Sequence, residues 1–224
     1  YGVPDEKLLP FAYSWGYGTY IHISEKLKAS RAGIRASLGI PEGSCVLLYC
    51  GRLAKGKGIE DLLEAYRRIK ADDVALVVVG DGVLTGKIRD YIARNNLRSV
   101  FLLGFQNRNE IQNIYAMADA VELPSLRETW GIVVSEAMCF SLPVIVSEAV
   151  GAGVDLVIEG YNGYKFAEGD VAALAMKLEE FLSRSEEEKK RMGARSRLLI
   201  EKWSQRDLAA SLTENLDLIY SRRV

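Results

Sequence analysis

Short apolar runs alternate with stretches of helical periodicity between residues 45 and 167. The runs predict strands at Cys45–Cys50, Ala75–Val79, Val100–Leu103, Ala118–Leu123, Pro143–Val146 and Gly163–Ala167. The intervening patterns predict helices near 58–70, 84–95, 109–117 and 131–140. A run such as Ala-Leu-Val-Val-Val is apolar on both faces, which a strand needs when helices cover its sheet from both sides. Because short connections favour right-handed crossovers, we predict an α/β fold: a Rossmann-like, doubly wound sheet of about six parallel strands with helices on both faces.

Two segments flank the alternating region. Residues 1–40 are polar and rich in aromatic side chains, with one short charged helix predicted over Ser30–Leu38. They show no strand-then-helix rhythm, which is typical of a linker or docking segment and not of a core. After Val171 the pattern is helical, over Glu186–Lys202 and Gln205–Arg222. We therefore predict a lead-in segment over 1–40 and one Rossmann-like domain with C-terminal helices over 41–224.

Composition excludes several classes of protein. The net charge of −1 gives no overall field that favours nucleic acid or an anionic membrane. Cys45, Cys50 and Cys139 lie in apolar runs without metal-ligand spacing, which predicts buried thiols in a reducing compartment. No apolar run reaches the ~18–20 residues that span a bilayer. We expect a cytoplasmic protein that binds no nucleic acid and inserts no segment into a membrane.

A glycine-rich turn, residues 51–58, follows the first predicted strand. Its spacing fits a nucleoside-triphosphate loop, but Gly58 stands where Ser or Thr must hold magnesium. It also begins like a dinucleotide fingerprint, but Asp61 takes the place of the third glycine. In a third interpretation Arg52 forms paired charge-assisted hydrogen bonds and Lys57 supplies a point charge, so that both side chains neutralise a diphosphate. We favour the third interpretation.

Two carboxylates eight positions apart, Glu128 and Glu136, flank the junction between the fourth predicted strand and the helix near 131–140. The start of a helix attracts anions, because its backbone N–H groups are unpaired and its dipole is positive there. Carboxylates do not bind phosphate directly, because both groups are negatively charged. They suit a ligand that carries hydroxyl groups beside its phosphates, such as a nucleotide sugar.

In their order and spacing, these segments and several shorter ones resemble the C-terminal, donor-binding domain of retaining glycosyltransferases of the group 1 family (family 4), which have the two-domain GT-B architecture. The resemblance covers about residues 1–170, and the lead-in is similar to the family's interdomain hinge. It departs at Ser141, where the family usually has glycine, and at Asp155, where many members have glutamate. The matching segments are Gly51-Arg52-Leu53 with Lys57-Gly58, Val79-Gly80-Asp81-Gly82, Val100–Phe105, Tyr115–Ala120, Pro124-Ser125 leading into Glu128-x7-Glu136, Pro143-Val144-Ile145 and Gly160–Gly163.

The resemblance implies a role for each matching site residue. Arg52 and Lys57 would hold the donor diphosphate, and Glu136 would accept hydrogen bonds from the ribose hydroxyls. Glu128 would lie beside the transferred sugar, so that Glu128, Arg52 and Lys57 form the implied catalytic set. Further ligand contacts are implied for Gly51, for the backbone of Thr129, Trp130, Gly131, Ile132 and Val133, and for Phe105 and Gln106 beside the nucleobase.

The resemblance also implies a function. The full enzyme would transfer a sugar from a nucleoside diphosphate sugar to a hydroxyl of a glycan or lipid-linked acceptor, as in polysaccharide biosynthesis, with retention and without metal or cofactor. The acceptor would bind an N-terminal domain that this chain lacks, and any association with the inner face of a membrane would come from that half. A start at Tyr1 fits an excised fragment. Two alternatives stay open: a nucleotide-binding module without turnover, and an NAD-dependent Rossmann enzyme.

Four other residues receive different interpretations. Asp81 is expected to cap the helix after the second strand, and Asp119 to be structural. Trp130 either contacts the sugar or packs beneath the junction. His22 lies in the lead-in without a visible partner, and we assign it no catalytic role.

Overall fold

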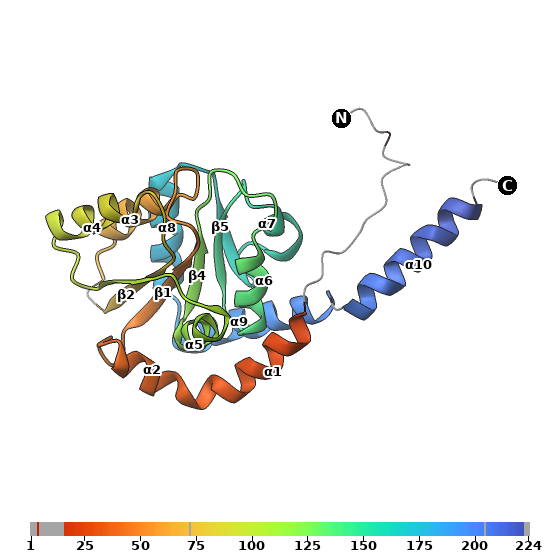
Figure 1. Ribbon diagram of the computed structural model, residues 1–224, viewed down its shortest axis with the longest axis horizontal. Helices are drawn as coiled ribbons and strands as arrows, with labels where there is room; N and C mark the ends of the chain where they lie inside the picture. The colour runs from red at the N-terminus through yellow and green to blue at the C-terminus, as the bar shows by residue number, and fades with distance from the viewer. Residues whose placement is uncertain (1–3, 5–15, 72, 204, 222–224) are drawn as a thin grey trace.

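The computed structural model describes residues 4, 16–71, 73–203 and 205–221 (Figure 1). Its centre is one six-stranded parallel sheet in the order β3-β2-β1-β4-β5-β6. This is the strand order of a doubly wound Rossmann-like sheet, and its direction reverses between β1 and β4. The predicted fold is confirmed. The strands are β1 Cys45–Cys50, β2 Val74–Val79, β3 Val100–Gly104, β4 Ala120–Leu123, β5 Val144–Ser147 and β6 Gly163–Phe166.

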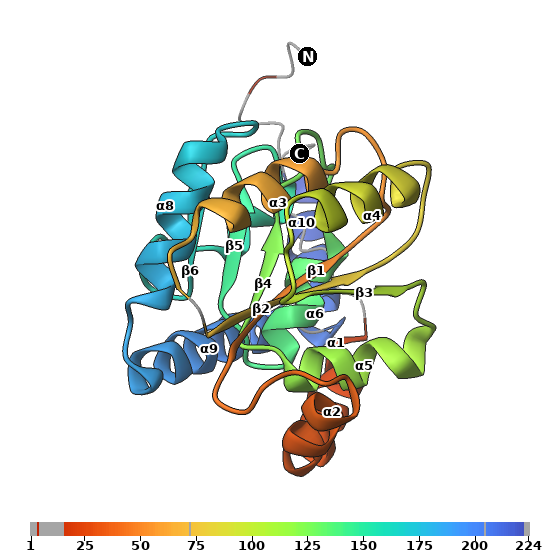
Figure 2. The ribbon, with the colours of Figure 1, turned by 90° about the vertical axis from the view of Figure 1, so that its left-hand side faces the viewer.

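Helices cover both faces of the sheet (Figures 1 and 2). One face carries α3 Ile59–Arg68, α4 Thr85–Arg94 and α8 Val171–Leu182. The other carries α1 Tyr17–Leu27, the short 3₁₀ helix η2 Lys28–Ser30, α2 Arg31–Ser37, α5 Arg108–Met117, α6 Ile132–Cys139, α7 Gly151–Leu156 and most of α9 Glu186–Glu201.

Strand β2 shows why the sheet needs both layers. All six of its residues are buried. Val77 packs into the core beneath α5 and α6, while Leu76 packs into the core beneath α3 and α8. Because successive side chains of a strand point to opposite faces, a run without a polar position gives two buried faces, and each large apolar side chain contributes about 1.5–3 kcal/mol by its burial.

The lead-in segment differs from its prediction. Residues 1–3 and 5–15 lie outside the described residues, but α1 and α2 pack on the sheet. Tyr17 and Tyr20 are 4% and 2% exposed and belong to the larger core cluster. The expectation that this region is no core is therefore wrong from Tyr17 onward. Its role as a hinge in a longer protein stays a prediction.

Asp119 ties α2 to the sheet. Its carboxylate accepts hydrogen bonds from Arg31, from Arg35 (Nη2 to Oδ2, 2.6 Å) and from the backbone N–H of Val46 (2.7 Å). The pair with Arg35 is largely shielded, since each of the two side chains is 16% exposed. The structural role predicted for Asp119 is confirmed.

The chain also contains features that the sequence pattern did not predict. Helix α7 follows β5 without a predicted counterpart. Ser141 has φ +57°, the left-handed conformation that favours glycine, so the turn before β5 keeps a glycine-like backbone although its residue is serine.

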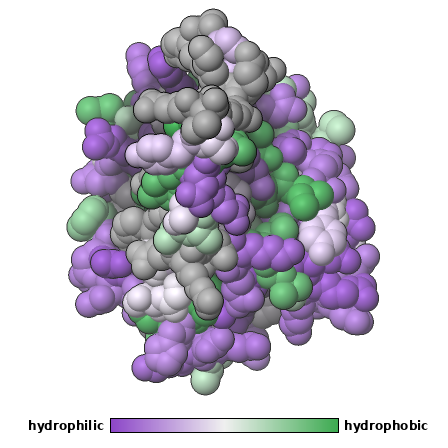
Figure 3. All heavy atoms as spheres, turned by 90° about the vertical axis from the view of Figure 1, so that its right-hand side faces the viewer, coloured by the Kyte–Doolittle hydropathy of each residue, from purple (hydrophilic) through white to green (hydrophobic). Residues whose placement is uncertain are grey.

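Helix α10, Gln205–Ser221, extends beyond the layered body (Figure 1). It carries the exposed apolar residues Leu212, Leu216, Ile219 and Tyr220. From the side on which α10 extends, Figure 3 shows a mostly hydrophilic surface with hydrophobic patches. Among the described residues, no helix is long and apolar enough to cross a membrane.

Candidate functional site

The glycine-rich turn after β1 lies directly against the end of β4. The N–H of Leu126 donates to the carbonyl of Gly56 at 2.9 Å. Gly58 has φ +68°, and a Cβ at this position would meet the Pro124 carbonyl oxygen at 1.8 Å. A serine or threonine has no room here, so the structure excludes the side chain that a triphosphate loop would need for magnesium.

Two of the predicted site residues form an ion pair across these loops. Lys57 Nζ lies 2.6 Å from Glu128 Oε2, and the two side chains are 32% and 21% exposed. Glu128 is fixed through its backbone, whose N–H donates to Ala149 and whose carbonyl accepts from Gly151. Lys57 and Glu128 therefore belong to one cluster, in which each charge compensates the other.

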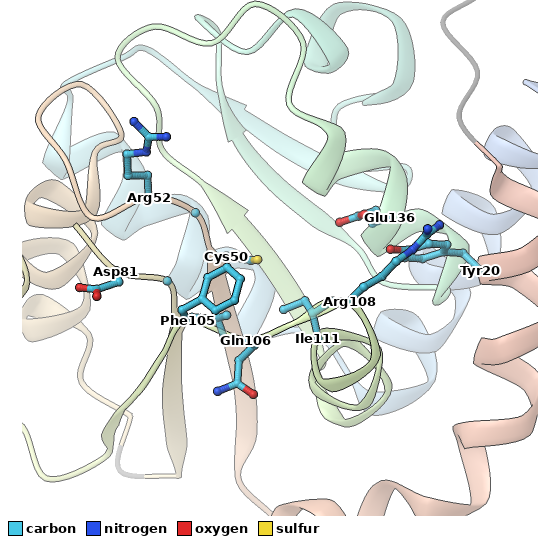
Figure 4. A pocket seen from close by; sticks show the side chains of 12 residues that line it. Tyr20, Cys50, Arg52, Asp81, Phe105, Gln106, Arg108, Ile111 and Glu136 are labelled. Carbon is cyan, nitrogen blue, oxygen red and sulfur yellow. The ribbon is translucent and has the colours of Figure 1, made fainter.

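Neither Lys57 nor Glu128 lines the cavity of about 490 Å³ that opens at the carboxyl ends of β1, β2 and β3 (Figure 4). The cavity lies next to the point where the strand order reverses, which is where open α/β sheets bind ligands. Five residues predicted from the sequence line it: Gly51, Arg52, Phe105, Gln106 and Glu136. The sequence did not predict a site role for Tyr20, Cys50, Arg108 and Ile111, which also line it.

Arg52 and Glu136 lie at opposite ends of the cavity, which Asp81 also lines on the side of Arg52 and Arg108 on the side of Glu136. Arg52 is exposed, and its guanidinium has no hydrogen-bond or ion-pair partner within residues 16–71, 73–203 and 205–221. Glu136 lies on α6, well away from Arg52 in Figure 4. A guanidinium suits phosphate oxygens, and a carboxylate accepts hydrogen bonds from hydroxyl groups. The geometry therefore fits a ligand that has phosphates at one end and hydroxyls at the other.

Tyrosine hydroxyls and a cation surround the Glu136 carboxyl group. The Tyr115 hydroxyl donates to its Oε2 at 2.8 Å, and Tyr20 is a second hydrogen-bond partner. Burial raises the pKa of Glu136, while these hydrogen bonds and the charge of Arg108 oppose the rise. The Arg108 guanidinium carbon lies 5.7 Å from the centre of the Tyr20 ring. No sequence motif marked Tyr20 or Arg108, because neither belongs to a glycine-rich or acidic pattern.

Phe105 and Gln106 lie at the mouth of the cavity, after β3. Phe105 is 78% exposed, so its ring offers a face on which a planar group can stack. The amide of Gln106 donates to the Leu103 carbonyl at 3.0 Å, which fixes that side chain. Their predicted place beside a nucleobase fits this geometry and stays a prediction.

Residues 129–133, at the start of α6, do not line the cavity. Trp130 packs against Trp203, with ring centres 5.8 Å apart, which agrees with the packing interpretation. Gly131 precedes the first turn of α6 with φ 94°. Contacts between a ligand and the segment Thr129, Trp130, Gly131, Ile132 and Val133 stay predictions, since none of these residues lines the cavity.

Two further groups at the cavity have defined electrostatics. Burial raises the pKa of the Cys50 thiol to about 12, so it is a neutral wall group and no nucleophile. Asp81 accepts hydrogen bonds from the Thr85 hydroxyl and the Gly82 N–H, which lower its pKa. The predicted capping role is wrong, because the N-cap of α4 is Leu84 and no side chain caps this helix. Within the described part of the chain, no three His, Cys, Asp or Glu side chains gather as metal ligands. The prediction that no metal is needed stays untested.

Comparisons with known proteins connect this site to a family. The sequence model described as "Glycosyl transferases group 1" matches residues 30–199. An uncharacterised glycosyltransferase of Methanocaldococcus jannaschii is 32% identical over 157 residues, which are 70% of this chain and 43% of that protein. The lipopolysaccharide 1,2-N-acetylglucosaminetransferase of Salmonella typhimurium is 33% identical over 146 residues, which are 60% of this chain and 38% of that protein.

The fold has counterparts among solved structures. Anabaena HepE, in complex with UDP and glucose, matches 98% of this chain and 58% of its own with a TM-score of 0.76 and 23% identity. Together with the family match, this confirms the predicted half of a GT-B fold. The chain spans less than half the length of the two relatives above.

Proposed function

Because the chain belongs to the glycosyl transferases group 1 family, we propose that it is the donor-binding half of a retaining glycosyltransferase. The whole enzyme transfers a sugar from a nucleoside diphosphate sugar to a hydroxyl of a glycan or lipid-linked acceptor. The observation that supports this most is the cavity itself, with the Glu136 carboxyl group at one end and, at the other, the Arg52 guanidinium, which has no partner among the described residues. HepE, which shares the fold, was solved with UDP and glucose.

In this proposal the charges of the site serve the leaving group. Arg52 and Lys57 neutralise the diphosphate as the bond to the sugar breaks, which is the main electrostatic demand of the step. Lys57 Nζ also forms an ion pair with Glu128 at 2.6 Å. When Lys57 binds the phosphates, the Glu128 carboxylate therefore lies next to them. Glu128 then contacts the transferred sugar, and the start of α6 adds a favourable dipole.

Retention follows from attack on the face from which the diphosphate leaves, assisted by a phosphate oxygen. The neutral Cys50 thiol fits a cavity without a protein nucleophile. The acceptor hydroxyl gives its proton to the departing phosphate, and the new glycosidic bond replaces the bond to that phosphate. No metal takes part, because arginine, lysine and the helix start supply the positive charge.

A second candidate function is nucleotide-sugar binding without transfer by this chain alone. It is favoured by the limited part of the relatives that the chain matches, which is 43% and 38% of the two proteins compared. The NAD-dependent alternative receives no support from the family to which the chain belongs.

Calorimetric titration with UDP, GDP, ADP and pyrophosphate tests the proposal. We expect Arg52→Ala and Lys57→Ala each to weaken binding of all these ligands by about 1–3 kcal/mol, because each removes a charge-assisted contact. Glu136→Ala should weaken nucleoside diphosphates and leave pyrophosphate unchanged, because only the former carry ribose hydroxyls.

Arg94→Ala serves as the matched control. Arg94 is a surface cation at the end of α4, with a side chain that is 81% exposed, and its loss should leave all affinities unchanged. Binding of NADH that no diphosphate displaces would contradict the proposal. An equal loss of nucleoside diphosphate and pyrophosphate on Glu136→Ala would remove the ribose role of that residue.

A further inference from the structure

We infer that Tyr20, on helix α1, is a positioning residue that holds the Glu136 carboxylate in place for the ribose of the donor. The inference rests on the proposed function, and it adds to the site a residue from the lead-in segment. Tyr20 is 2% exposed, lines the cavity and is a hydrogen-bond partner of Glu136. Figure 4 shows Tyr20 beside Glu136, with Arg108 lying across it.

Two phenol groups reach Glu136 from different elements. Tyr115 comes from α5 and donates to Oε2 at 2.8 Å, while Tyr20 comes from α1. A carboxylate has about four acceptor positions on its two oxygens. Two fixed partners therefore leave acceptor capacity for the two neighbouring hydroxyls of a ribose. The two partners also hold the Glu136 side chain in one rotamer before a ligand binds, so binding costs less conformational entropy.

The Tyr20 ring is itself fixed on two sides. It packs edge-on against Phe140, with ring centres 6.2 Å apart and an interplanar angle of 87°. On the other side, the guanidinium carbon of Arg108, a residue of α5, lies 5.7 Å from the centre of the Tyr20 ring. Phe140 also packs against Tyr115, at 5.4 Å. The two hydrogen-bonding tyrosines thus share one aromatic support, and the position of α1 determines where the Tyr20 hydroxyl lies.

The electrostatics of the cluster agree with this role. Burial raises the pKa of Glu136, which disfavours the charged form that accepts hydrogen bonds best. Tyr115, Tyr20 and the charge of Arg108 each oppose that rise. Removing the Tyr20 hydroxyl therefore weakens both the orientation and the ionisation of Glu136.

A purely structural tyrosine would show different behaviour. The contact of Tyr20 with Phe140 involves its ring, which phenylalanine also supplies. The hydroxyl faces the polar groups, because Glu136 and Arg108 are both its hydrogen-bond partners. Tyr20→Phe consequently separates core packing from positioning.

The experiment compares wild type and Tyr20→Phe in calorimetric titrations. The ligands are the nucleoside diphosphate among UDP, GDP and ADP that wild type binds, and its 2′,3′-dideoxy counterpart. We expect Tyr20→Phe to bind the ribonucleotide about tenfold more weakly, as for a lost hydrogen bond to a charged group. Binding of the dideoxy ligand should change less than about twofold, because this ligand has no ribose hydroxyl that could donate a hydrogen bond to Glu136. In the Glu136→Ala background, Tyr20→Phe should have no further effect.

Tyr66→Phe is the matched control, because its hydroxyl donates to the Val74 carbonyl at 2.6 Å and Tyr66 is no part of the cavity lining. If Tyr20→Phe fails to fold, Tyr20→Met provides a second variant without the hydroxyl, with the same expected loss of selectivity. Equal losses for both ligands, or no loss, would overturn the inference while leaving the proposed function intact. If wild type binds no nucleoside diphosphate, the proposed function fails and the inference falls with it.

Discussion

Glu122 places a carboxyl group inside the core of the sheet. It lies on β4, is fully buried, and pairs in register with Tyr49 of β1 and Ile145 of β5. Neither carboxyl oxygen has a hydrogen-bond partner among the described residues. Burial therefore raises the pKa of Glu122 well above its usual range, and nearby backbone N–H groups oppose this only in part.

The raised pKa predicts a pH-dependent stability. Below pH ~4 the Glu122 carboxyl is neutral in both states. As the pH rises, the unfolded chain ionises first, so the free energy of unfolding falls by about 1.4 kcal/mol per pH unit until the pH passes the pKa of the folded state. We expect Glu122→Leu to be more stable than wild type at pH 7, with a difference that shrinks toward pH 4. Urea titrations between pH 4 and 8 measure this difference.

Glu122→Gln provides the matched control, because it keeps the shape and polarity of the side chain and removes only its ionisation. Its stability relative to Glu122→Leu should stay constant with pH. If the free energy of unfolding of wild type follows the same pH profile as that of both variants, the pKa of Glu122 does not differ between the folded and unfolded states.

Some residues of the site were predicted from the sequence, and others were not. Arg52 and Glu136 were predicted because they stand in a phosphate-type turn and at a strand-to-helix junction, and both line the cavity. The pairing of Lys57 with Glu128 was not predicted, since it depends on two loops that meet only in the folded chain. Tyr20 was missed because its contact with Glu136 spans more than a hundred positions of the sequence.

At the scale of elements, strands were predicted better than the helices around them. No predicted strand end lies more than two residues from its place in the structure. An apolar run that is buried on both faces is read directly from the sequence. Helix α1 was missed although Tyr17, Tyr20, Ile21 and Leu27 have the spacing of a buried helix face, because the linker prediction rested on the aromatic-rich composition of the segment. Helix α7 is only six residues long and starts with Gly-Ala-Gly, which has little helical periodicity.

The attachment of α2 to the sheet gives a prediction at this scale. Asp119→Ala removes the partner of Arg31 and Arg35 and of the Val46 N–H. We expect a loss of about 2–3 kcal/mol in the free energy of unfolding, somewhat below the ~3–5 kcal/mol of a fully buried pair. Urea unfolding measures the loss, and hydrogen exchange should show reduced protection of the α2 amides.

Asp90→Ala is the control for that prediction. Asp90 pairs with Arg94 at 3.9 Å, and both side chains are more than 60% exposed (68% and 81%). Its removal should cost less than about 0.5 kcal/mol. Equal losses for the two variants would show that the Asp119 cluster contributes no more than a surface pair.

At the scale of the molecule, the chain matches less than half the length of each of the two relatives. We expect it to bind a nucleoside diphosphate and not to transfer sugar. A ligand at 100 times its Kd adds about 2.7 kcal/mol to stability, which corresponds to a rise in Tm of about 5–10 °C for a chain of this size. Differential scanning fluorimetry measures the shift, and it should shrink in Arg52→Ala.

The same preparation tests the absence of transfer. Incubation with a nucleoside diphosphate sugar should release nucleoside diphosphate only slowly, by hydrolysis, and added glycans or lipid-linked sugars should not accelerate the release. Acceptor-dependent formation of a new glycoside by this chain alone would contradict the expectation. It would mean that the acceptor site lies within these 224 residues.

The contact between Gly58 and the Pro124 carbonyl has a consequence for how this protein can evolve. The two loops touch through main-chain atoms, with no side chain between them that could shrink or grow to absorb a displacement. An insertion in one loop would therefore have to be matched by a change in the other. We expect natural variants to keep the lengths of both loops fixed, and to acquire new sugar preferences through substitutions around Glu128.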